Sequence, residues 1–520
     1  SILSLYLSAF HFFVVTLQRE NAKSNVMNTD TFEMVAKTFR GLEDVLAEEL
    51  RQLGASNVEP GRRMVSFEGD KEMLYKANLC CRTALRILKP FYKFTAHTPD
   101  KLYDRIKEYD WSKMLSPTDT FAIDVTVNSD EFTHSRFVTY RVKDAIVDYF
   151  RDRDAEGKRP GVRLTDADMM LNVHISGSDV TVSLDSSGES LHKRGWRAAQ
   201  TEAPINEVLA AGIILKSGWR GDSPFVDPMC GSGTFIVEAA LIAANIAPGI
   251  FRSSFAFERW NDFEPEILDR LYNDDSRERE VTCPIIGADM SPKAVAIARE
   301  NLKQAGVAKY ATVDIRTLSQ WSEAPSKGVL VTNPPYGERL KPEDLDGLYA
   351  LLGEKLKHVF TGYHAWIIGY RDEQFAKIGL APSYKEPILN GSLECELREY
   401  VIFDGDMRSF RKAGGAIKDP SRRPESKPRR NSDDRSLSAK RGSFRKSRFD
   451  KPFTRERDER HDRKPDNTSV AAAAETVAVH SDNPLAARRN PDALKSITGR
   501  QPQISARKGW RRKNSGNSES

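Results

Sequence analysis

The stretch Phe225-Val-Asp-Pro-Met-Cys-Gly-Ser-Gly-Thr-Phe235 decides the fold class of the central part of the chain. A short apolar strand ends at an acidic residue, the chain turns through Gly231 and Gly233, and an apolar helix runs on to Ile246. The glycines allow the backbone to approach a ligand closely, and the free N–H groups at a helix start favour a bound carboxylate or phosphate. The pattern predicts a cofactor-binding turn; the alternative is a tight turn without a ligand.

A second acidic residue stands at the end of the next predicted strand. Asp289 closes residues 284–289, where doubly wound sheets place a carboxylate on ribose hydroxyl groups. The alternative is an exposed aspartate that caps the following helix. Because Ser291 already stands at the N-cap of that helix, we expect Asp289 to be free for a ligand.

The spacing of the two acids differs from that of a plain dinucleotide-binding unit. Asp289 lies 62 residues after Asp227, whereas a plain unit needs about 20. Residues 248–279 are therefore predicted to be an insertion on the sheet. Position 236 is Ile, so the third glycine of the dinucleotide fingerprint is absent. We predict a nucleoside-like cofactor without a pyrophosphate.

Short apolar runs alternate with helical periodicity from residue 191 to about residue 405, which is typical of a parallel doubly wound sheet. The helix over residues 293–305 has clear ends, with Ser291 as N-cap, Pro292 at its first position and Gly306 just beyond it. The fold class is therefore α/β. The predicted strands are residues 224–227, 284–289, 311–315, 328–332, 365–369 and 399–403.

The fourth of these strands runs into Val329-Leu-Val-Thr-Asn-Pro-Pro-Tyr336. Prolines stiffen the backbone and remove N–H donors, so the local carbonyl groups point outward as acceptors. The Asn333 side-chain oxygen and the Pro334 carbonyl are suited to accept both protons of an amino group, while Tyr336 offers a stacking face for a base. Methyl transfer from a sulfonium needs alignment rather than a protein nucleophile. The segment predicts an amino-directed methyltransferase; the alternative is a simple turn.

The region before this sheet, residues 31–188, mixes alternating and helical apolar patterns and is predicted to be a compact α+β module. Residues 121–127 are a predicted strand and residues 138–150 a predicted helix. Two further strands, 170–175 and 180–184, form a predicted hairpin.

The net charge of +5 conceals an acidic body and a basic tail. Residues 411–520 hold 29 Lys and Arg against 14 Asp and Glu, which leaves residues 1–410 at −10. We predict disorder over residues 406–520, because so few apolar side chains cannot offset the ordering entropy. Its basic clusters suit salt-sensitive RNA binding, with a merely solubilising tail as the alternative.

Residues 1–26 contain a short apolar stretch with no basic residues before it. We interpret them as a non-structural leader upstream of a true start at Met27, with a signal peptide as the alternative. Five scattered cysteines show neither disulfide-framework nor metal-site spacing, and they are Cys80, Cys81, Cys230, Cys283 and Cys395. We expect a cytoplasmic protein with no metal and no membrane partner.

Three motifs resemble the RlmL-type bacterial 23S rRNA guanine-N2 methyltransferases: Asp227-Pro-Met-Cys-Gly-Ser-Gly-Thr234, Asn333-Pro-Pro-Tyr-Gly-Glu-Arg-Leu340 and Leu191-His-Lys-Arg-Gly-Trp-Arg197. The similarity spans residues 31–403. It implies a class I Rossmann-like methyltransferase domain over residues 191–405. It also implies a ferredoxin-like segment over residues 27–80 and a THUMP RNA-binding domain over residues 81–190.

The resemblance implies roles for individual residues. The cofactor, S-adenosylmethionine, would be held by Asp227, Cys230, Gly231, Gly233, Thr234, Asp289 and Met290. The guanine amine would be held by a clamp that consists of Asn333, Pro334, Pro335 and Tyr336.

Two departures from the family pattern affect what is expected. The family usually has an acid just after the third strand to meet the adenine, and this chain has Thr317 there. Some members also carry a second, fused methyltransferase, and this chain has its basic tail instead. We expect the second activity to be missing.

We predict methyl transfer from S-adenosylmethionine to the N2 of a guanine in 23S rRNA or a large-subunit precursor. The alternatives are the same chemistry on tRNA, adenine-N6 methylation of DNA, and a non-catalytic ribosome-assembly factor that keeps the fold. An RNA-type capture module argues against DNA, and an intact clamp argues against a non-catalytic role. In the connector between the modules, Arg194 and Arg197 either guide RNA or form a solvated hinge.

Overall fold

The computed structural model describes residues 31–201, 204–335, 342–370, 372–391, 393–405 and 407–412. The leader expected over residues 1–26 and the tail beyond residue 412 lie outside the described residues. Residues 407–412 form the short helix α12 (Met407–Lys412) where the sequence predicts disorder. Phe410 of α12 stacks on Phe403 with ring centroids 4.4 Å apart, which gives this turn an apolar contact.

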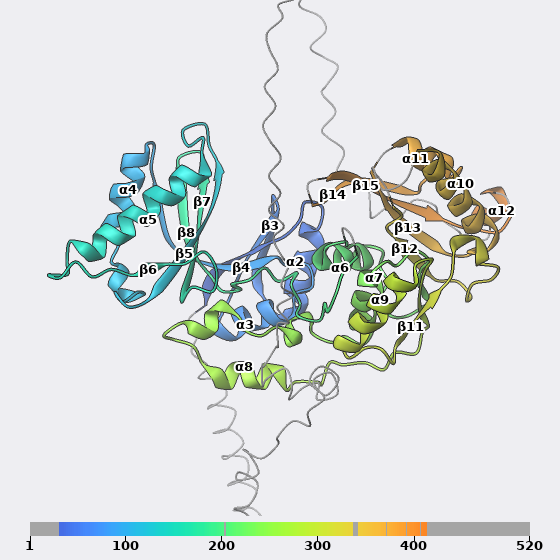
Figure 1. The fold of residues 1–520 in the computed structure, drawn as a ribbon, viewed down its shortest axis with the longest axis horizontal. Helices are drawn as coiled ribbons and strands as arrows, with labels where there is room; N and C mark the ends of the chain where they lie inside the picture. Colours follow the sequence, from blue (N-terminus) through green and yellow to red (C-terminus); the bar gives the residue numbers. More distant parts are fainter. Residues whose placement is uncertain are drawn as a thin grey trace, which may run out of the picture. The chain divides into compact units, whose positions relative to one another are not determined.

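One eight-stranded sheet runs through the N-terminal part of the chain (Figure 1). The long strand β4 joins its two halves, because its first residues pair with β1 while most of its length pairs with β8. The sheet has the order β2-β3-β1-β4-β8-β7-β5-β6. Its strands are β1 (Phe32–Lys37), β2 (Ser56–Gly61), β3 (Met64–Gly69), β4 (Arg86–Thr95), β5 (Thr120–Asn128), β6 (Gly161–Val162), β7 (Met169–Ser176) and β8 (Asp179–Asp185).

Two helices accompany each half of this sheet. The helices α2 (Glu43–Leu53) and α3 (Lys71–Cys80) belong to the first half, and α4 (Pro99–Glu108) and α5 (Ser135–Arg151) cover one face of the second (Figure 1). Val138, Val142 and Ile146 recur at helical spacing along α5 and are buried in the same core cluster as the strand residues Val173 and Val182. The predicted strand, helix and hairpin of this module are confirmed.

The second sheet has seven strands in the order β11-β10-β9-β12-β13-β15-β14. The first five are parallel, as predicted, but β15 runs antiparallel between β13 and β14. The prediction missed β14 because Lys385, Glu386 and Pro387 interrupt its apolar residues and only Ile388 is buried. The strands are β9 (Phe225–Asp227), β10 (Ile285–Asp289), β11 (Ala311–Ile315), β12 (Val329–Thr332), β13 (His364–Gly369), β14 (Tyr384–Asn390) and β15 (Leu393–Val401).

Helices cover both faces of this sheet. Phe225 and Val329 face a core shared with α6 (Glu207–Lys216), α7 (Thr234–Ala243) and α9 (Pro292–Gln304). The next residue in each strand, Val226 and Leu330, faces α10 (Pro342–His358) and the short helix η4 (Leu318–Gln320) on the other side. Because both faces are covered, the central strands β9, β10 and β12 are apolar along most of their length, and their polar residues stand at the carboxyl ends.

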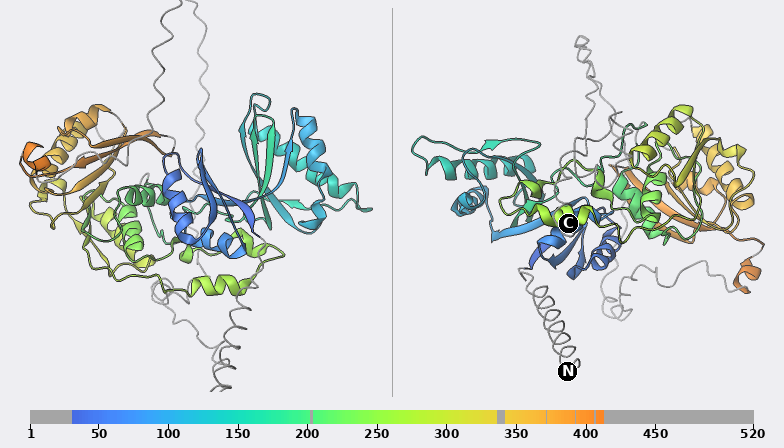
Figure 2. Two further views of the ribbon diagram at one scale, coloured as in Figure 1. Left: turned by 180° about the vertical axis from the view of Figure 1, so that it is seen from behind. Right: turned by 90° about the horizontal axis from the view of Figure 1, so that it is seen from below.

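Residues 248–279 are an insertion between α7 and β10, as predicted, but they pack against the N-terminal module rather than on the sheet. The insertion contains η2 (Pro248–Phe251), η3 (Ala256–Arg259) and α8 (Pro265–Tyr272), and α8 runs close to α3 (Figures 1 and 2). The ring of Phe257 stacks on Tyr75 of α3 at 4.2 Å. The Nζ of Lys71 lies 2.7 Å from a carboxylate oxygen of Glu264. The aromatic side chain of Phe257 in the insertion therefore packs against Tyr75 of α3.

Within the described residues, no helix is both long enough and apolar enough to cross a membrane. All five cysteines are free thiols, which agrees with the absence of a disulfide framework in the sequence pattern.

Candidate functional site

The register of the seven-stranded sheet brings the predicted site residues to one edge. The central strand β9 is paired in parallel with β10 on one side and β12 on the other. Asp227 lies opposite Gly287, two residues before Asp289, and Val226 lies opposite Leu330, three residues before Asn333. The acids and the clamp are therefore neighbours at the carboxyl ends of the strands, where ligands bind in open α/β sheets.

Asp227 is a buried carboxyl group at the centre of this edge. Its Oδ1 accepts a hydrogen bond from the Thr332 hydroxyl at 2.8 Å and another from the Met229 N–H at 3.2 Å. Burial raises the pKa of Asp227 to about 7, and the nearby charge of Asp289 acts in the same direction. The sequence reasoning missed Thr332, although a hydroxyl at the end of an apolar strand was a signal for it. A cation bound here would favour the charged form of Asp227.

Glycine is favoured at the two positions of the turn for different structural reasons. Gly233 has φ 80° at the N-cap of α7, and a Cβ there would lie 2.8 Å from the Cβ of Ala298 on α9. Gly231 has φ 53°, and among the described residues a Cβ there would meet only the Thr201 hydroxyl, at 3.7 Å. Gly233 is thus required by the packing of α7 on α9, whereas Gly231 borders open space that a ligand can occupy.

Asp289 connects the turn to the next helix. Its Oδ2 accepts from the Gly231 N–H and its Oδ1 from the Ser291 N–H, each at 2.9 Å. Ser291 caps α9 as predicted. Asp289 thus has two protein partners, and its expected binding of a ligand stays a prediction. Each carboxylate oxygen nonetheless accepts more than one hydrogen bond, so ribose hydroxyls can still be bound. Beside it, Met290 is 73% exposed and offers an apolar surface.

Cys230 and Thr234 are both buried in the turn. Burial raises the pKa of the Cys230 thiol, so this side chain is an apolar packing group rather than a nucleophile. The Thr234 hydroxyl accepts a hydrogen bond from Arg197 at 3.0 Å. Their predicted contacts with the cofactor stay predictions.

The clamp contains an acceptor that the protein leaves unpaired. Oδ1 of Asn333 is buried and has no hydrogen-bond partner among the described residues. An unsatisfied buried acceptor costs roughly 1–3 kcal/mol, so a partner supplied by a substrate would recover that cost. Pro334 is buried and Pro335 half-buried directly after it. Tyr336 lies outside the described residues, and its stacking role stays a prediction.

Both expectations for the connector arginines are contradicted. The Arg194 guanidinium is buried, contacts Glu238 at 3.3 Å and donates to the Leu191 carbonyl at 2.9 Å. Arg197 donates to Glu207 and to two hydroxyls of the turn. Neither arginine is a solvated hinge residue or is available for RNA, because protein acceptors occupy both.

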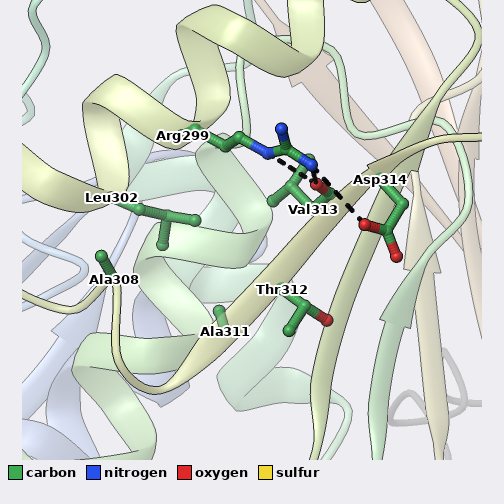
Figure 3. A pocket seen from close by; sticks show the side chains of 7 residues that line it. All are labelled: Arg299, Leu302, Ala308, Ala311, Thr312, Val313 and Asp314. Atoms are coloured by element: carbon green, nitrogen blue, oxygen red, sulfur yellow. Dashed lines mark hydrogen bonds and ion pairs between the residues drawn. The ribbon is translucent and has the colours of Figure 1, made fainter.

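Thr317 stands just after the third strand, and Asp314 lies next to the last residue of that strand. The Thr317 hydroxyl contacts Ser319 at 2.9 Å and begins η4, while Asp314 pairs with Arg299 at 3.6 Å. A pocket of about 280 Å³ lies beside this pair, between α9 and β11 (Figure 3). None of its lining residues belongs to the predicted site, so we assign no cofactor to it. Across the described ranges, no group of three or more His, Cys, Asp or Glu side chains could hold a metal ion.

Three family descriptions match successive parts of the chain. Residues 33–88 match the RlmL ferredoxin-like domain, residues 96–185 match the THUMP domain, and residues 194–398 match the RMKL-like methyltransferase domain.

Similar proteins have names that agree with these matches. The "Ribosomal RNA large subunit methyltransferase K/L" of Syntrophotalea carbinolica is 41% identical over 378 residues, 70% of this chain and 52% of that protein. The "Putative RNA methyltransferase" of Synechocystis sp. is 36% identical over 383 residues, 73% of this chain and 99% of that protein. The crystal structure titled "SMU.472, a putative methyltransferase complexed with SAH" is 32% identical with a TM-score of 0.65, over 73% of this chain and 100% of that one. The chain thus spans about half the length of the K/L relatives.

Proposed function

The chain belongs to the RMKL-like family of S-adenosylmethionine-dependent methyltransferases, and from this premise we propose that it methylates the exocyclic N2 of a guanine in 23S rRNA. The observation that carries the proposal is the unpaired, buried Oδ1 of Asn333 at the strand end beside the cofactor turn. Such an acceptor suits an amino group as substrate. The ribosomal RNA names of several relatives support the choice of substrate.

The residues at the strand ends fit S-adenosylmethionine, which supplies an activated methyl group when bound. Gly231 leaves space beside the turn, and Asp289 has acceptor capacity for ribose hydroxyls. The buried carboxyl group of Asp227 suits the positive end of the cofactor. Met290 offers an exposed apolar side chain to the base. The cofactor set is therefore Asp227, Cys230, Gly231, Gly233, Thr234, Asp289 and Met290.

The clamp acts by orientation. Asn333 Oδ1 and the Pro334 carbonyl accept the two amine protons, so the nitrogen lone pair points at the methyl carbon. A bond forms between nitrogen and carbon while the carbon–sulfur bond breaks. The electron pair of the broken bond stays on sulfur, and the nitrogen releases one of its protons to water. Tyr336 stacks on the base in this proposal.

The N-terminal module is the RNA-capture part of the proposal. We divide the chain into a ferredoxin-like segment over residues 27–80, a THUMP domain over residues 81–190 and a methyltransferase domain over residues 191–405. The THUMP match over residues 96–185 supports RNA rather than DNA as the partner. The basic tail adds sequence-independent affinity for phosphates.

The test supplies the purified chain with methyl-labelled S-adenosylmethionine and, in separate reactions, with 23S rRNA, tRNA and duplex DNA. Digestion to nucleosides identifies the product. We expect N2-methylguanosine from 23S rRNA alone. N2-methylguanosine from tRNA alone, or N6-methyladenine from DNA, would overturn the choice of substrate, and no labelled nucleoside at all would favour a non-catalytic role.

A further inference from the structure

The connector that leads into the methyltransferase domain lies against the glycine turn. The N–H of Ala198 donates to Oδ1 of Asn301 at 2.9 Å, and the Asn301 amide donates to the Ser232 carbonyl at 2.9 Å. The Thr201 hydroxyl is the nearest group to the open side of Gly231. A segment that precedes β9 by a whole helix therefore forms part of the wall of the cofactor turn.

Arg197 makes the most direct link between this connector and the turn. Its Nε donates to Oε1 of Glu207 at 2.7 Å. Its Nη1 donates to the Ser232 hydroxyl at 3.2 Å, and its Nη2 donates to the Thr234 hydroxyl at 3.0 Å. The Arg197 side chain is 16% exposed and that of Glu207 is 7% exposed, so water competes little for these bonds.

The two hydroxyls stand on either side of Gly233, which has the left-handed φ of 80° at the N-cap of α7. A turn with glycines at 231 and 233 has unusual backbone freedom, and ordering it on ligand binding would weaken affinity. A planar guanidinium that donates hydrogen bonds to both flanking side chains removes this freedom before the ligand binds. Lysine has three N–H donors on one rotatable ammonium group, but it lacks the rigid planar fork that matches these acceptors.

We propose that Arg197 is a positioning residue for the cofactor: it holds Ser232 and Thr234 and thereby keeps the glycine turn in its binding shape. The inference rests on the proposed cofactor site. It assigns the connector a part in cofactor affinity in addition to joining the two modules. Arg197 touches neither the methyl group nor the substrate amine in this role.

The test uses the full chain and calorimetric titration with S-adenosylhomocysteine. Loss of Arg197 alone would leave Glu207 buried without its partner, so the test variant is the doubly neutral Arg197→Gln/Glu207→Gln. A second variant, Ser232→Ala/Thr234→Val, removes the two acceptors and keeps the ion pair. Arg220→Gln is the control, since Arg220 is exposed and donates to the Leu215 and Trp219 carbonyls, away from the turn.

Both double variants are expected to raise the dissociation constant at least about tenfold, because two hydrogen bonds that shape the turn are lost. The KM for S-adenosylmethionine should rise in parallel, while kcat at saturating cofactor stays within about twofold. The dissociation constant of Arg197→Lys should lie between those of the double variants and that of the unaltered chain. Arg220→Gln should bind as the unaltered chain does, and thermal unfolding of each variant reports whether the fold is intact.

Unchanged affinity in folded double variants overturns the inference. A fall in kcat with unchanged KM also overturns it, because the defect would then lie in the chemical step. If the unaltered chain binds S-adenosylhomocysteine but methylates no RNA, the proposed function fails while the role of Arg197 is still decided by the titrations. If the unaltered chain does not bind it, both fail.

Discussion

The glycine turn follows β9 and the clamp follows the neighbouring strand β12, yet the polar atoms of the two segments differ in their hydrogen bonding. In the turn, the Gly231 N–H is bonded to Asp289, and the hydroxyls of Ser232 and Thr234 are bonded to Arg197. In the clamp, Oδ1 of Asn333 is buried with no partner among the described residues. The turn is completed by the protein, whereas the clamp is left for the substrate to complete.

This difference follows from what each part has to do. A cofactor is bound in every cycle by a surface of fixed shape, and preorganised groups cost no rearrangement when it arrives. An amine has to be held so that its lone pair points one way, and acceptors with free lone pairs can do this.

The largest expected effect comes from removing the open acceptor. Asn333→Ala should lower turnover by a factor of about 10³ or more, because orientation of the amine is lost, as in the loss of other transition-state hydrogen bonds. Titrations should show that binding of S-adenosylhomocysteine and of RNA hardly changes. Asn273→Ala at the end of α8, where the side chain bonds only the Asp269 carbonyl, is the control. Turnover close to that of the unaltered chain would contradict the clamp.

The two glycines of the turn give the next largest effect. Gly233→Ala should destabilise the fold by about 2–4 kcal/mol, because its φ is 80° and the new Cβ meets Ala298. Gly231→Ala should cost only about 1 kcal/mol, because space beside it is open. Urea unfolding measures both.

The comparison of Gly233→Ala with Gly231→Ala is informative only if the contact with Ala298 causes the larger destabilisation. Ala298→Gly should therefore recover part of the loss in the Gly233→Ala background. Equal destabilisation by the two alanine substitutions would remove the distinction between the two glycines.

The raised pKa of Asp227 predicts that the unfolding free energy of the cofactor-free chain falls as the pH rises. Its pKa is about 7 in the folded chain against 3.8 for the ordinary group, so the folded state retains a proton that the unfolded state has lost. The contribution of Asp227 to the unfolding free energy is therefore full below about pH 4 and is lost as the pH rises through 7.

Asp227→Asn keeps an acceptor for Thr332 but cannot ionise. Above pH 7 it should be more stable than the unaltered, cofactor-free chain, by up to about 4 kcal/mol, with a flatter profile between pH 4 and pH 7. Urea unfolding over this range measures the effect, with the exposed Asp275→Asn as control. An unchanged profile would show that Asp227 ionises normally.

The smallest effect is expected far from both regions. Deleting residues 411–520 removes a surplus of 15 positive charges and should flatten the salt dependence of RNA binding. Turnover at saturating RNA should change less than about threefold, since the clamp and the turn are untouched. Binding measured between 50 and 300 mM salt tests this. An unchanged salt dependence would identify the tail as a solubilising segment.

Most of the second sheet was predictable because its signals are local. The strands β9 to β13 follow from short apolar runs, and the caps of α9 follow from Ser291, Pro292 and Gly306. The errors arose where side-chain partners are distant. β14 is too polar to be recognised without its neighbour β15, and the insertion has aromatic side chains whose partners lie on α3. The short helix α12 depends on the stacking of Phe410 on Phe403.

The sequence by itself determined which residues gather at the site. Asp227, Asp289 and Asn333 each follow an apolar strand, and the carboxyl ends of parallel strands meet at one edge whatever the remaining details. Only the tertiary structure decided how these residues are partnered. Arg197 is hydrogen-bonded to Ser232, 35 residues later in the sequence, and Thr332 is hydrogen-bonded to Asp227, 105 residues earlier. No local sequence pattern encodes a partner at such a separation. The open acceptor of Asn333 likewise follows only from the tertiary structure, because the absence of a partner among the described residues depends on every group packed around the atom.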